Sequence, residues 1–294
     1  MRGQIIQQIL DVMKTNENIF FITADMGINL VEVIENSFPE RFTNVGIAEQ
    51  NMIGIAAGLA NLNYRPFVYT ISNFAIHRCF EQIRNDIVLH NIPVTILGTS
   101  TGYDNAPLGP THHVIDDWGS IKSFPGIDVF CPSSITYASS LVGKVLLNKR
   151  PTYIRIPKGE HLEPNSEDDT VKFYGTDNKI LLISYGNPAQ TCLEVQKSRP
   201  DVSVLILNKL HPLDENELFS NLSNHKRLMV VEDHFADNGL YSSICQILAK
   251  KNKSHLTIES ISPKSYSFEV GLNPNYFFRK HRLDVESLID SLSD

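Results

Sequence analysis

Apolar runs alternate with amphipathic stretches along the chain, and this alternation predicts strands and helices in turn. The first amphipathic stretch places Ile5, Ile9 and Met13 on one face of a helix, and residues 18–23 then form an apolar run typical of a buried strand. Amphipathic spacing also predicts helices over 74–90 and 136–148. Wholly apolar runs predict further buried strands at 66–71, 92–98, 127–130 and 152–156.

The apolar pattern stops in a polar stretch and then begins again. Residues 158–178 are rich in charged side chains, as expected of a linker. Strands that alternate with helices are typical of parallel sheets covered on both faces. We therefore predict an α/β fold of two consecutive three-layer domains with mainly parallel sheets, at 1–157 and 179–294, joined by a linker at 158–178. In the second domain, apolar runs that predict strands lie at 180–184, 202–207, 228–232 and 256–261.

Residues 41–58 are the central segment of this interpretation: an apolar stretch expected to be extended leads directly into a helix. Gly46 permits a tight turn, and Glu49 then falls in the first helical turn. An acid at this position is favoured by the helix dipole in any fold, so a purely structural role for Glu49 stays open. Asp25 follows the first strand, where open α/β sheets collect ligands, although an aspartate there also suits a helix N-cap.

Composition narrows the class of protein. The 294 residues are 42% hydrophobic, which is enough for real cores, and the formal net charge is -7. An acidic chain without a basic stripe argues against binding to nucleic acid or to an anionic membrane. The cysteines are far apart and form no CxxC pair, so neither a disulfide framework nor a zinc site is expected. The amino terminus lacks the apolar core of a signal peptide, which predicts a cytoplasmic location.

Residues 44–60, NVGIAEQNMIGIAAGLA, resemble the pyrimidine-binding domain of the transketolase family of thiamine-diphosphate enzymes. Residues 231–244, VEDHFADNGLYSSI, are similar to a motif of that family's carboxyl-terminal domain. The resemblance implies that 1–157 is the pyrimidine-binding domain and 179–294 the C-terminal domain. It also implies that Glu49 is catalytic, because the matching acid binds a ring nitrogen of the cofactor's aminopyrimidine in a water-poor pocket.

The resemblance extends to further cofactor and catalytic residues. In NFAIHRCFEQIRN, Phe74 matches a residue that stacks on the aminopyrimidine, and His77 stands where many members carry a tyrosine. A core position would explain Phe74 equally. Arg78 matches an arginine of several members, and a surface ion pair would also explain it. The resemblance places Asp25 beside the thiazolium ring. In GPTHH, within the long loop of residues 99–118, His112 matches a catalytic histidine over the reacting carbons of the substrate.

Substrate contacts follow from the same resemblance, with two departures. Arg155 in YIRIPKG matches an arginine that binds the distal phosphate of the substrate, although a salt bridge would also explain it. Leu108 replaces an acid that holds a sugar hydroxyl, and Ser100 replaces a common histidine. Losing polar partners for buried hydroxyls changes which ligand a site accepts. We therefore expect a substrate preference that differs from that for ordinary ketose phosphates.

The sequence lacks the GDG motif with which the family holds a divalent metal on the cofactor's diphosphate. The resemblance therefore implies that Mg²⁺ or Ca²⁺ is held by a separate N-terminal transketolase-like subunit, in an α2β2 heterotetramer, and that this chain holds no metal.

The expected activity is transfer of a two-carbon ketol unit from a ketose sugar to an aldehyde through thiamine diphosphate. One alternative is a decarboxylating synthase or a beta-type subunit of a 2-oxo acid dehydrogenase. Another is a non-catalytic regulatory paralogue.

Overall fold

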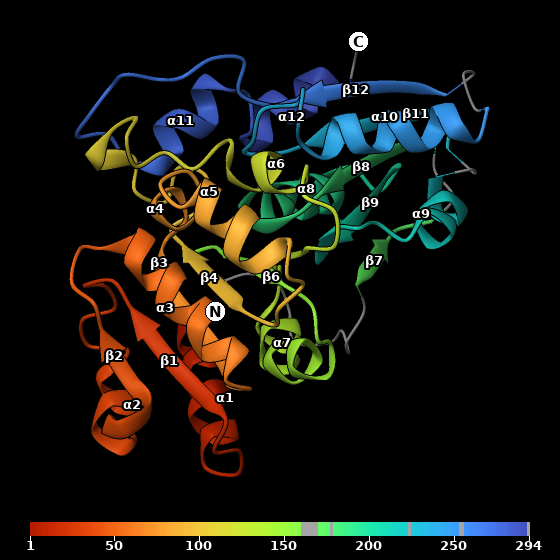
Figure 1. The fold of residues 1–294 in the computed structure, drawn as a ribbon. Helices are drawn as coiled ribbons and strands as arrows, with labels where there is room; N and C mark the ends of the chain where they lie inside the picture. The colour runs from red at the N-terminus through yellow and green to blue at the C-terminus, as the bar shows by residue number, and fades with distance from the viewer. Residues whose placement is uncertain (160–169, 177–178, 223–224, 253–255, 293–294) are drawn as a thin grey trace.

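The structure is a computed structural model, and it describes residues 1–159, 170–176, 179–222, 225–252 and 256–292. Two sheets with helices on their faces make up the fold (Figure 1). The first has seven strands in the order β10-β5-β6-β4-β3-β1-β2, and the second has five in the order β12-β11-β8-β9-β7. The predicted α/β class with mainly parallel sheets is confirmed.

In the first sheet every neighbouring pair is parallel except β10 with β5. The carboxyl ends of the parallel strands therefore meet at one edge, where the residues after β1, β2, β3 and β4 come together. The strands are β1 (Ile19–Thr23), β2 (Phe42–Asn44), β3 (Arg65–Ile71), β4 (Thr95–Thr99), β5 (Asp128–Phe130), β6 (Thr152–Ile156) and β10 (Lys209–His211).

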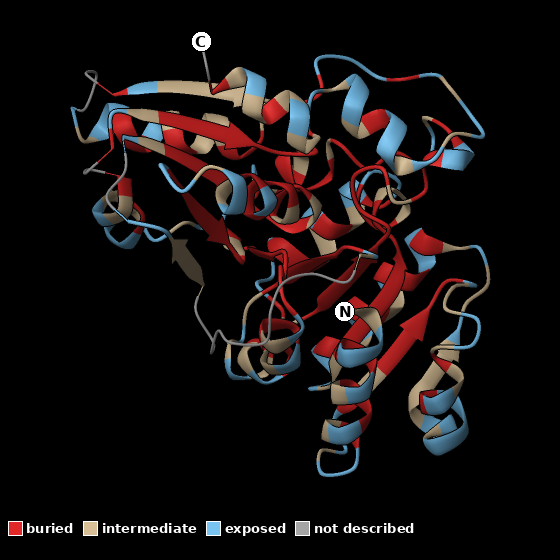
Figure 2. Cartoon of the chain, turned by 180° about the vertical axis from the view of Figure 1, so that it is seen from behind, coloured by how far each residue is buried: buried red, intermediate tan, exposed pale blue. Residues whose placement is uncertain are grey.

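Alternate residues of these strands enter different cores. Phe21 packs with helices α1 and α7 on one face of the first sheet, and Ile22 packs with α3 on the other. Figure 2 shows most strand residues in the colour of buried residues. Burial on both faces explains why the strands are apolar throughout. The helical segments of this half are α1 (Arg2–Met13), α2 (Glu32–Ser37), η1 (Pro39–Arg41), α3 (Glu49–Asn61), α4 (Ser72–Ile76), α5 (Phe80–Gln82), η2 (Ile83–Val88), η3 (Ala106–Leu108), α6 (Asp117–Ile121) and α7 (Ile135–Leu147).

The second sheet is parallel except for its edge strand β7, which pairs antiparallel with β9. Its strands are β7 (Val171–Tyr174), β8 (Ile180–Ser184), β9 (Val202–Leu207), β11 (Arg227–Val231) and β12 (Thr257–Ile261). The helices are α8 (Gly186–Ser198), α9 (Glu215–Leu222), α10 (Leu240–Lys250), α11 (Pro274–Lys280) and α12 (Val285–Ser291).

One predicted element is wrong in detail. The single helix expected over 74–90 is interrupted at residues 77–79, and the segment from Ile83 to Val88 is π-helical. At the break, the carbonyl of Arg78 accepts a hydrogen bond from the Gln50 side chain instead of continuing a helical ladder. Arg78 lies at this interruption.

The domain boundaries at 157 and 179 stay a prediction. Of the predicted linker 158–178, residues 160–169 and 177–178 lie outside the described residues. Within it, Val171–Tyr174 form β7 of the second sheet.

Candidate active site

Glu49 is the first residue of α3 and is buried, with 3% of its surface exposed. The turn before it is shaped by Gly46, whose φ of 71° lies in the left-handed region. The Asn44 side-chain oxygen accepts hydrogen bonds from the backbone N–H of Gly46 and of Asp25, each at 3.0 Å. Asn44 therefore ties the loop after β1 to the turn that delivers Glu49.

Arg78 links Glu49 to Phe74. Its Nη1 atom lies 2.8 Å from Glu49 Oε2, and its guanidinium carbon lies 4.3 Å from the centre of the Phe74 ring. Phe74 comes from α4, which begins directly after β3. A buried carboxylate is costly unless it is paired, and the face of an aromatic ring attracts a cation. The surface ion pair considered for Arg78 is thus a pair with a buried acid.

His112 lies beside the same aromatic ring. The imidazole of His112 and the ring of Phe74 meet edge to face, with centroids 5.3 Å apart. The Asn73 amide donates hydrogen bonds to the carbonyls of Thr111, at 3.2 Å, and His113, at 2.8 Å, which flank His112. Asn73 therefore holds the loop that carries His112 and His113 against α4. Nothing in the sequence marked Asn73, except that it adjoins Phe74.

The imidazole of His112 is half-buried and is held on one side. Its Nδ1 lies 3.0 Å from the Thr111 hydroxyl oxygen. Partial burial and the nearby charge of Lys158 keep the pKa of His112 below its ordinary value, which favours the neutral imidazole. The adjacent His113 is buried instead, where it packs against Tyr103 and Phe277.

The other predicted cofactor residues lie on neighbouring loops. Asp25 is exposed with a φ of 50°, and α2 begins only at Glu32, so Asp25 is not an N-cap. His77 is directed elsewhere: its Nε2 lies 3.5 Å from the Asp116 carboxylate. Glu49, Phe74 and His112 therefore lie together. Arg78 contacts both Glu49 and Phe74, and His112 contacts Phe74.

The substrate candidates divide into buried and exposed positions. Ser100 is buried just after β4 with a φ of 64°, whereas Leu108 is 57% exposed at the end of η3. The loop of Leu108 is fixed by a 2.8 Å hydrogen bond from the Gly271 N–H to the Pro107 carbonyl.

The position of Arg155 does not support a substrate role. The side chain is fully buried, and its guanidinium donates to the carboxylates of Asp117 (3.2 Å) and Asp233 (3.1 Å) and to a backbone carbonyl (2.9 Å). The side chain has no contact with solvent, and the salt bridge considered as an alternative is the contact that the structure shows. Arg155 joins the first sheet to the segment after β11.

Glu232, Asp233 and His234 follow β11, on the side of the second sheet that faces Arg155, and all three are buried. Glu232 accepts hydrogen bonds from the N–H groups of Leu240 and Tyr241 at the start of α10. Burial raises the pKa of Glu232 to about 7 and that of Asp233 to about 6, and lowers that of His234 to about 4. Asp233 accepts a hydrogen bond from Arg155, and His234 accepts one from the Gly119 N–H, so these residues connect the two halves of the chain.

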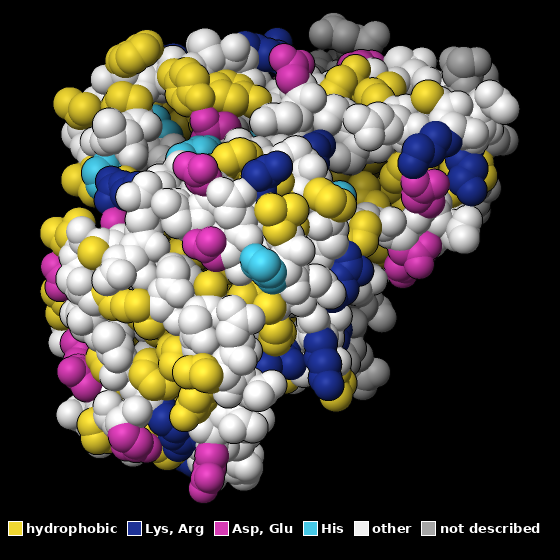
Figure 3. All heavy atoms as spheres, in the orientation of Figure 1, with side chains coloured by type: hydrophobic (Ala, Val, Ile, Leu, Met, Phe, Trp, Pro, Cys, Tyr) yellow, Lys and Arg dark blue, Asp and Glu magenta, His cyan; other side chains and the backbone are white. Residues whose placement is uncertain are grey.

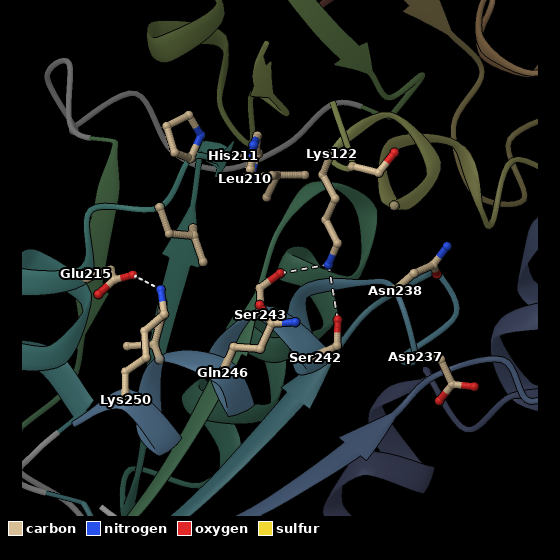
Figure 4. Close-up of a pocket in the computed structure, with 15 residues that line it drawn as sticks. Lys122, Leu210, His211, Glu215, Asp237, Asn238, Ser242, Ser243, Gln246 and Lys250 are labelled. Carbon is tan, nitrogen blue, oxygen red and sulfur yellow. Dashed lines mark hydrogen bonds and ion pairs between the residues drawn. The ribbon is translucent and has the colours of Figure 1, made fainter. Parts of the chain in front are cut away.

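A cavity of about 500 Å³ lies elsewhere, between α6 and α10 (Figure 4). Lys122 on its wall donates hydrogen bonds to the Gly239 carbonyl and to the hydroxyls of Ser242 and Ser243. None of the predicted site residues lines this cavity. The described ranges contain no cluster of three or more His, Cys, Asp or Glu side chains suited to a metal, and no helix there is long and apolar enough to span a bilayer.

The chain is an α/β protein of two mainly parallel sheets, with a buried acid, an aromatic ring and an imidazole at the carboxyl edge of the first sheet, where open α/β sheets bind ligands. Two family models identify the family of this chain. The model of the transketolase pyrimidine-binding domain matches residues 2–162, and that of the transketolase C-terminal domain matches residues 170–273. The chain belongs to the transketolase family, and the resemblance of residues 44–60 is confirmed. Thiamine-diphosphate dependence is what this family implies.

Curated relatives include both split and full-length proteins. The chain is 26% identical over 292 residues to a subunit of apulose-4-phosphate transketolase from Actinobacillus succinogenes, a match that covers 92% of this chain and 94% of the relative. It is 30% identical over 263 residues to 1-deoxy-D-xylulose-5-phosphate synthase of Desulfotalea psychrophila, covering 84% of this chain but 40% of the relative. The chain therefore spans less than half of the synthase.

Solved structures share the fold. A split-gene transketolase, described as an inactive beta4 tetramer, matches with a TM-score of 0.87 and 24% identity, covering 99% of this chain and 96% of that one. A transketolase from Campylobacter jejuni matches with a TM-score of 0.80 and 18% identity, covering all of this chain and 46% of that one.

Proposed function

We propose that this chain is the C-terminal subunit of a split transketolase-like enzyme, which transfers a two-carbon ketol unit from a ketose donor to an aldehyde acceptor. The chain matches nearly the full length of a relative that is itself named as one subunit of a transketolase, but only 40% of a full-length synthase. That difference in coverage supports a division of the enzyme between two chains.

The observation that carries the proposal is the buried carboxylate of Glu49, which is linked through Arg78 to the ring of Phe74. These residues fit thiamine diphosphate, because an aminopyrimidine offers a flat ring for Phe74 and a ring nitrogen for a carboxylate. Bound thiamine diphosphate supplies a reactive carbon and an electron sink for carbon–carbon cleavage.

The residues of the chain would prepare that chemistry in distinct ways. Glu49 would share a proton with the ring nitrogen, and its burial strengthens this hydrogen bond. Phe74 would orient the ring by stacking, which contributes about 1 kcal/mol beyond burial. Since Nδ1 of His112 faces Thr111, its Nε2 is the nitrogen free to exchange a proton with a substrate oxygen.

The neighbouring loops complete the proposed site. We assign Asp25 and His77 to the cofactor side from the family resemblance, although the His77 imidazole is directed toward Asp116 in the free chain. Ser100 and Leu108 are assigned to the substrate side, where the apolar Leu108 would disfavour the sugar hydroxyl that an acid would hold.

The proposed partner is an N-terminal transketolase-like subunit that holds the diphosphate and its Mg²⁺ or Ca²⁺, in an α2β2 heterotetramer. Exposed apolar side chains support a covering chain: Val270, which lies beside Gly109 of the loop that carries His112, is 64% exposed, and Phe268, close to it in the chain, is 79% exposed. Hydrophobic atoms gather on the face around α11 at the upper left of Figure 3.

A second candidate function keeps the cofactor but changes the reaction. The 30% identity to a deoxyxylulose-phosphate synthase favours a decarboxylating synthase. Release of carbon dioxide from pyruvate by the reconstituted pair, without ketol transfer between sugars, would support this alternative.

The deciding experiment reconstitutes the chain with an N-terminal transketolase-like subunit, thiamine diphosphate and Mg²⁺, and measures ketol transfer from ketose phosphates to aldehydes. We expect activity only with both chains. Glu49→Gln should lower kcat by about a hundred- to ten-thousand-fold, while the exposed Glu81→Gln should leave it unchanged. Full activity in Glu49→Gln would remove Glu49 from the mechanism.

A further inference from the structure

Arg78 makes two contacts at once, and both are directed to the proposed cofactor residues. Its Nη1 donates to the Glu49 carboxylate at 2.8 Å, and the flat guanidinium carbon lies 4.3 Å from the centre of the Phe74 ring. A guanidinium is planar and carries its N–H donors in that plane. It therefore presents a flat face to an aromatic ring and an in-plane donor to a carboxylate.

An aminopyrimidine ring needs the same two partners under the proposed function. We propose that Arg78 is a displaceable occupant of the aminopyrimidine position, which holds Glu49 and Phe74 in the free subunit and must leave them before the cofactor's ring can bind. This inference rests on the proposed function, because it takes Glu49 and Phe74 as the ring's partners.

Hydrogen bonds hold the backbone around Arg78, whereas its side chain can rotate. The Gln50 amide donates to the Arg78 carbonyl at 2.9 Å, and the backbone N–H of His77 donates to the Asn73 carbonyl at 2.9 Å. On the other side, the Cys79 thiol donates to the Phe74 carbonyl at 3.3 Å. The side chain of Arg78 is 45% exposed, so rotation about its own bonds takes it into solvent.

Glu49 and Arg78 differ in what they lose when they separate. Only 3% of the Glu49 side chain is exposed, so its carboxylate needs a partner inside the protein. Arg78 can be hydrated once it swings out. Exchange of the arginine for the aminopyrimidine thus keeps the buried acid hydrogen-bonded before and after binding.

An internal occupant lowers the apparent affinity for the ring in proportion to the fraction of molecules in which the site is free. If about one molecule in ten has Arg78 turned away, removal of the side chain should tighten binding about tenfold. A residue that instead helps to hold the ring would give the opposite result, since its removal would weaken binding.

The test titrates the full chain, without a partner, with 4-amino-5-hydroxymethyl-2-methylpyrimidine and follows binding by NMR. We expect Arg78→Met to bind about tenfold more tightly than the wild type, and the exposed Arg84→Met, on the next helical segment, to bind like the wild type. Adding Glu49→Gln to Arg78→Met should abolish the gain. Circular dichroism checks that each variant folds.

If Arg78→Met does not fold, Arg78→Gln replaces it, because its amide can still donate to Glu49; we then expect about threefold tighter binding. Equal or weaker binding by the Arg78 variant overturns the inference, and so does no detectable binding at millimolar ligand by either protein. The readout requires no turnover. An active reconstituted enzyme whose Arg78 variant gains no affinity would refute only this inference, whereas a gain without reconstituted activity would refute only the ketol-transfer function.

Discussion

Nη1 of Arg155 lies 3.1 Å from Oδ1 of Asp233, and neither side chain is exposed to solvent. Arg155 belongs to β6 of the first sheet, and Asp233 follows β11 of the second. Asp117, at the start of α6, accepts from the same guanidinium at 3.2 Å. The two halves of the chain are thus connected by one buried cation between two buried acids.

Replacing Arg155 by methionine should destabilise the protein strongly. Removing the cation leaves Asp117 and Asp233 buried without a counter-charge, and breaking such a pair costs about 3–5 kcal/mol. Urea unfolding of the two proteins would measure the difference. Arg84→Met removes an exposed arginine and should change the stability by about 0.5 kcal/mol or less. A loss below about 1 kcal/mol for Arg155→Met would contradict the assigned role.

Glu232 should make the protein less stable as the pH rises. Burial raises the pKa of its carboxyl from 4.5 to about 7, so between these values the folded state holds a proton that the unfolded state has released. Stability is therefore highest below pH 4.5 for this group and falls by roughly 3 kcal/mol up to pH 7. Glu232→Gln should lack this fall.

The measurement compares the free energies of unfolding of wild type and Glu232→Gln across this pH range, in the same buffer series. The glutamine loses an acceptor for the α10 N–H groups, so its overall stability is lower. The pH dependence of the difference isolates the titration. Parallel curves for the two proteins would show that Glu232 is ionised in both states.

Gly102→Ala should be poorly tolerated. The φ of Gly102 is 55°, and an added Cβ would overlap the Asp233 carboxylate. We expect a loss of at least about 2 kcal/mol from strain and from the displaced ion pair. Gly143 lies within α7 with open space around its Cα, so Gly143→Ala should instead stabilise the protein by about 0.5–1 kcal/mol. Thermal unfolding of both variants provides the comparison.

Asn73→Ala should loosen the loop that carries His112 and lower the activity. The Asn73 amide holds the carbonyls on either side of His112, and its loss leaves that imidazole less well placed. In the reconstituted enzyme we expect kcat/KM to fall more than tenfold and the dependence of the rate on pH near the His112 titration to change. Asn85→Ala serves as the control. An unchanged kcat/KM and pH profile would show that Asn73 has only a structural role.

Much of the architecture could be predicted because the strands are buried on both faces. The run at 180–184 is apolar at nearly every position, and the observed β8 has the same limits. The turn before Glu49 could also be predicted from the sequence, since Gly46 and the helical spacing after it are local features. Strand β10 was not predicted, because only Leu210 of its three residues is apolar.

The partners of charged residues could not be predicted, because they lie far apart in the chain. Arg155 is 38 positions from Asp117 and 78 from Asp233, and Arg78 is 29 positions from Glu49. A single sequence shows an arginine within an apolar strand, which signals burial, but it does not show which acids meet it. A salt bridge, the alternative kept open for Arg155, is the contact that the structure shows, and the phosphate role stays a prediction.

The crossing of β10 into the first sheet limits how the chain can be dissected. Lys209–His211 come from the second half, yet they cover the outer edge of β5. A fragment that stops near residue 157 would leave β5 with unpaired backbone groups, and exposed strand edges recruit other chains. Such a truncated fragment should self-associate through β5 unless a peptide spanning β10 is supplied to it.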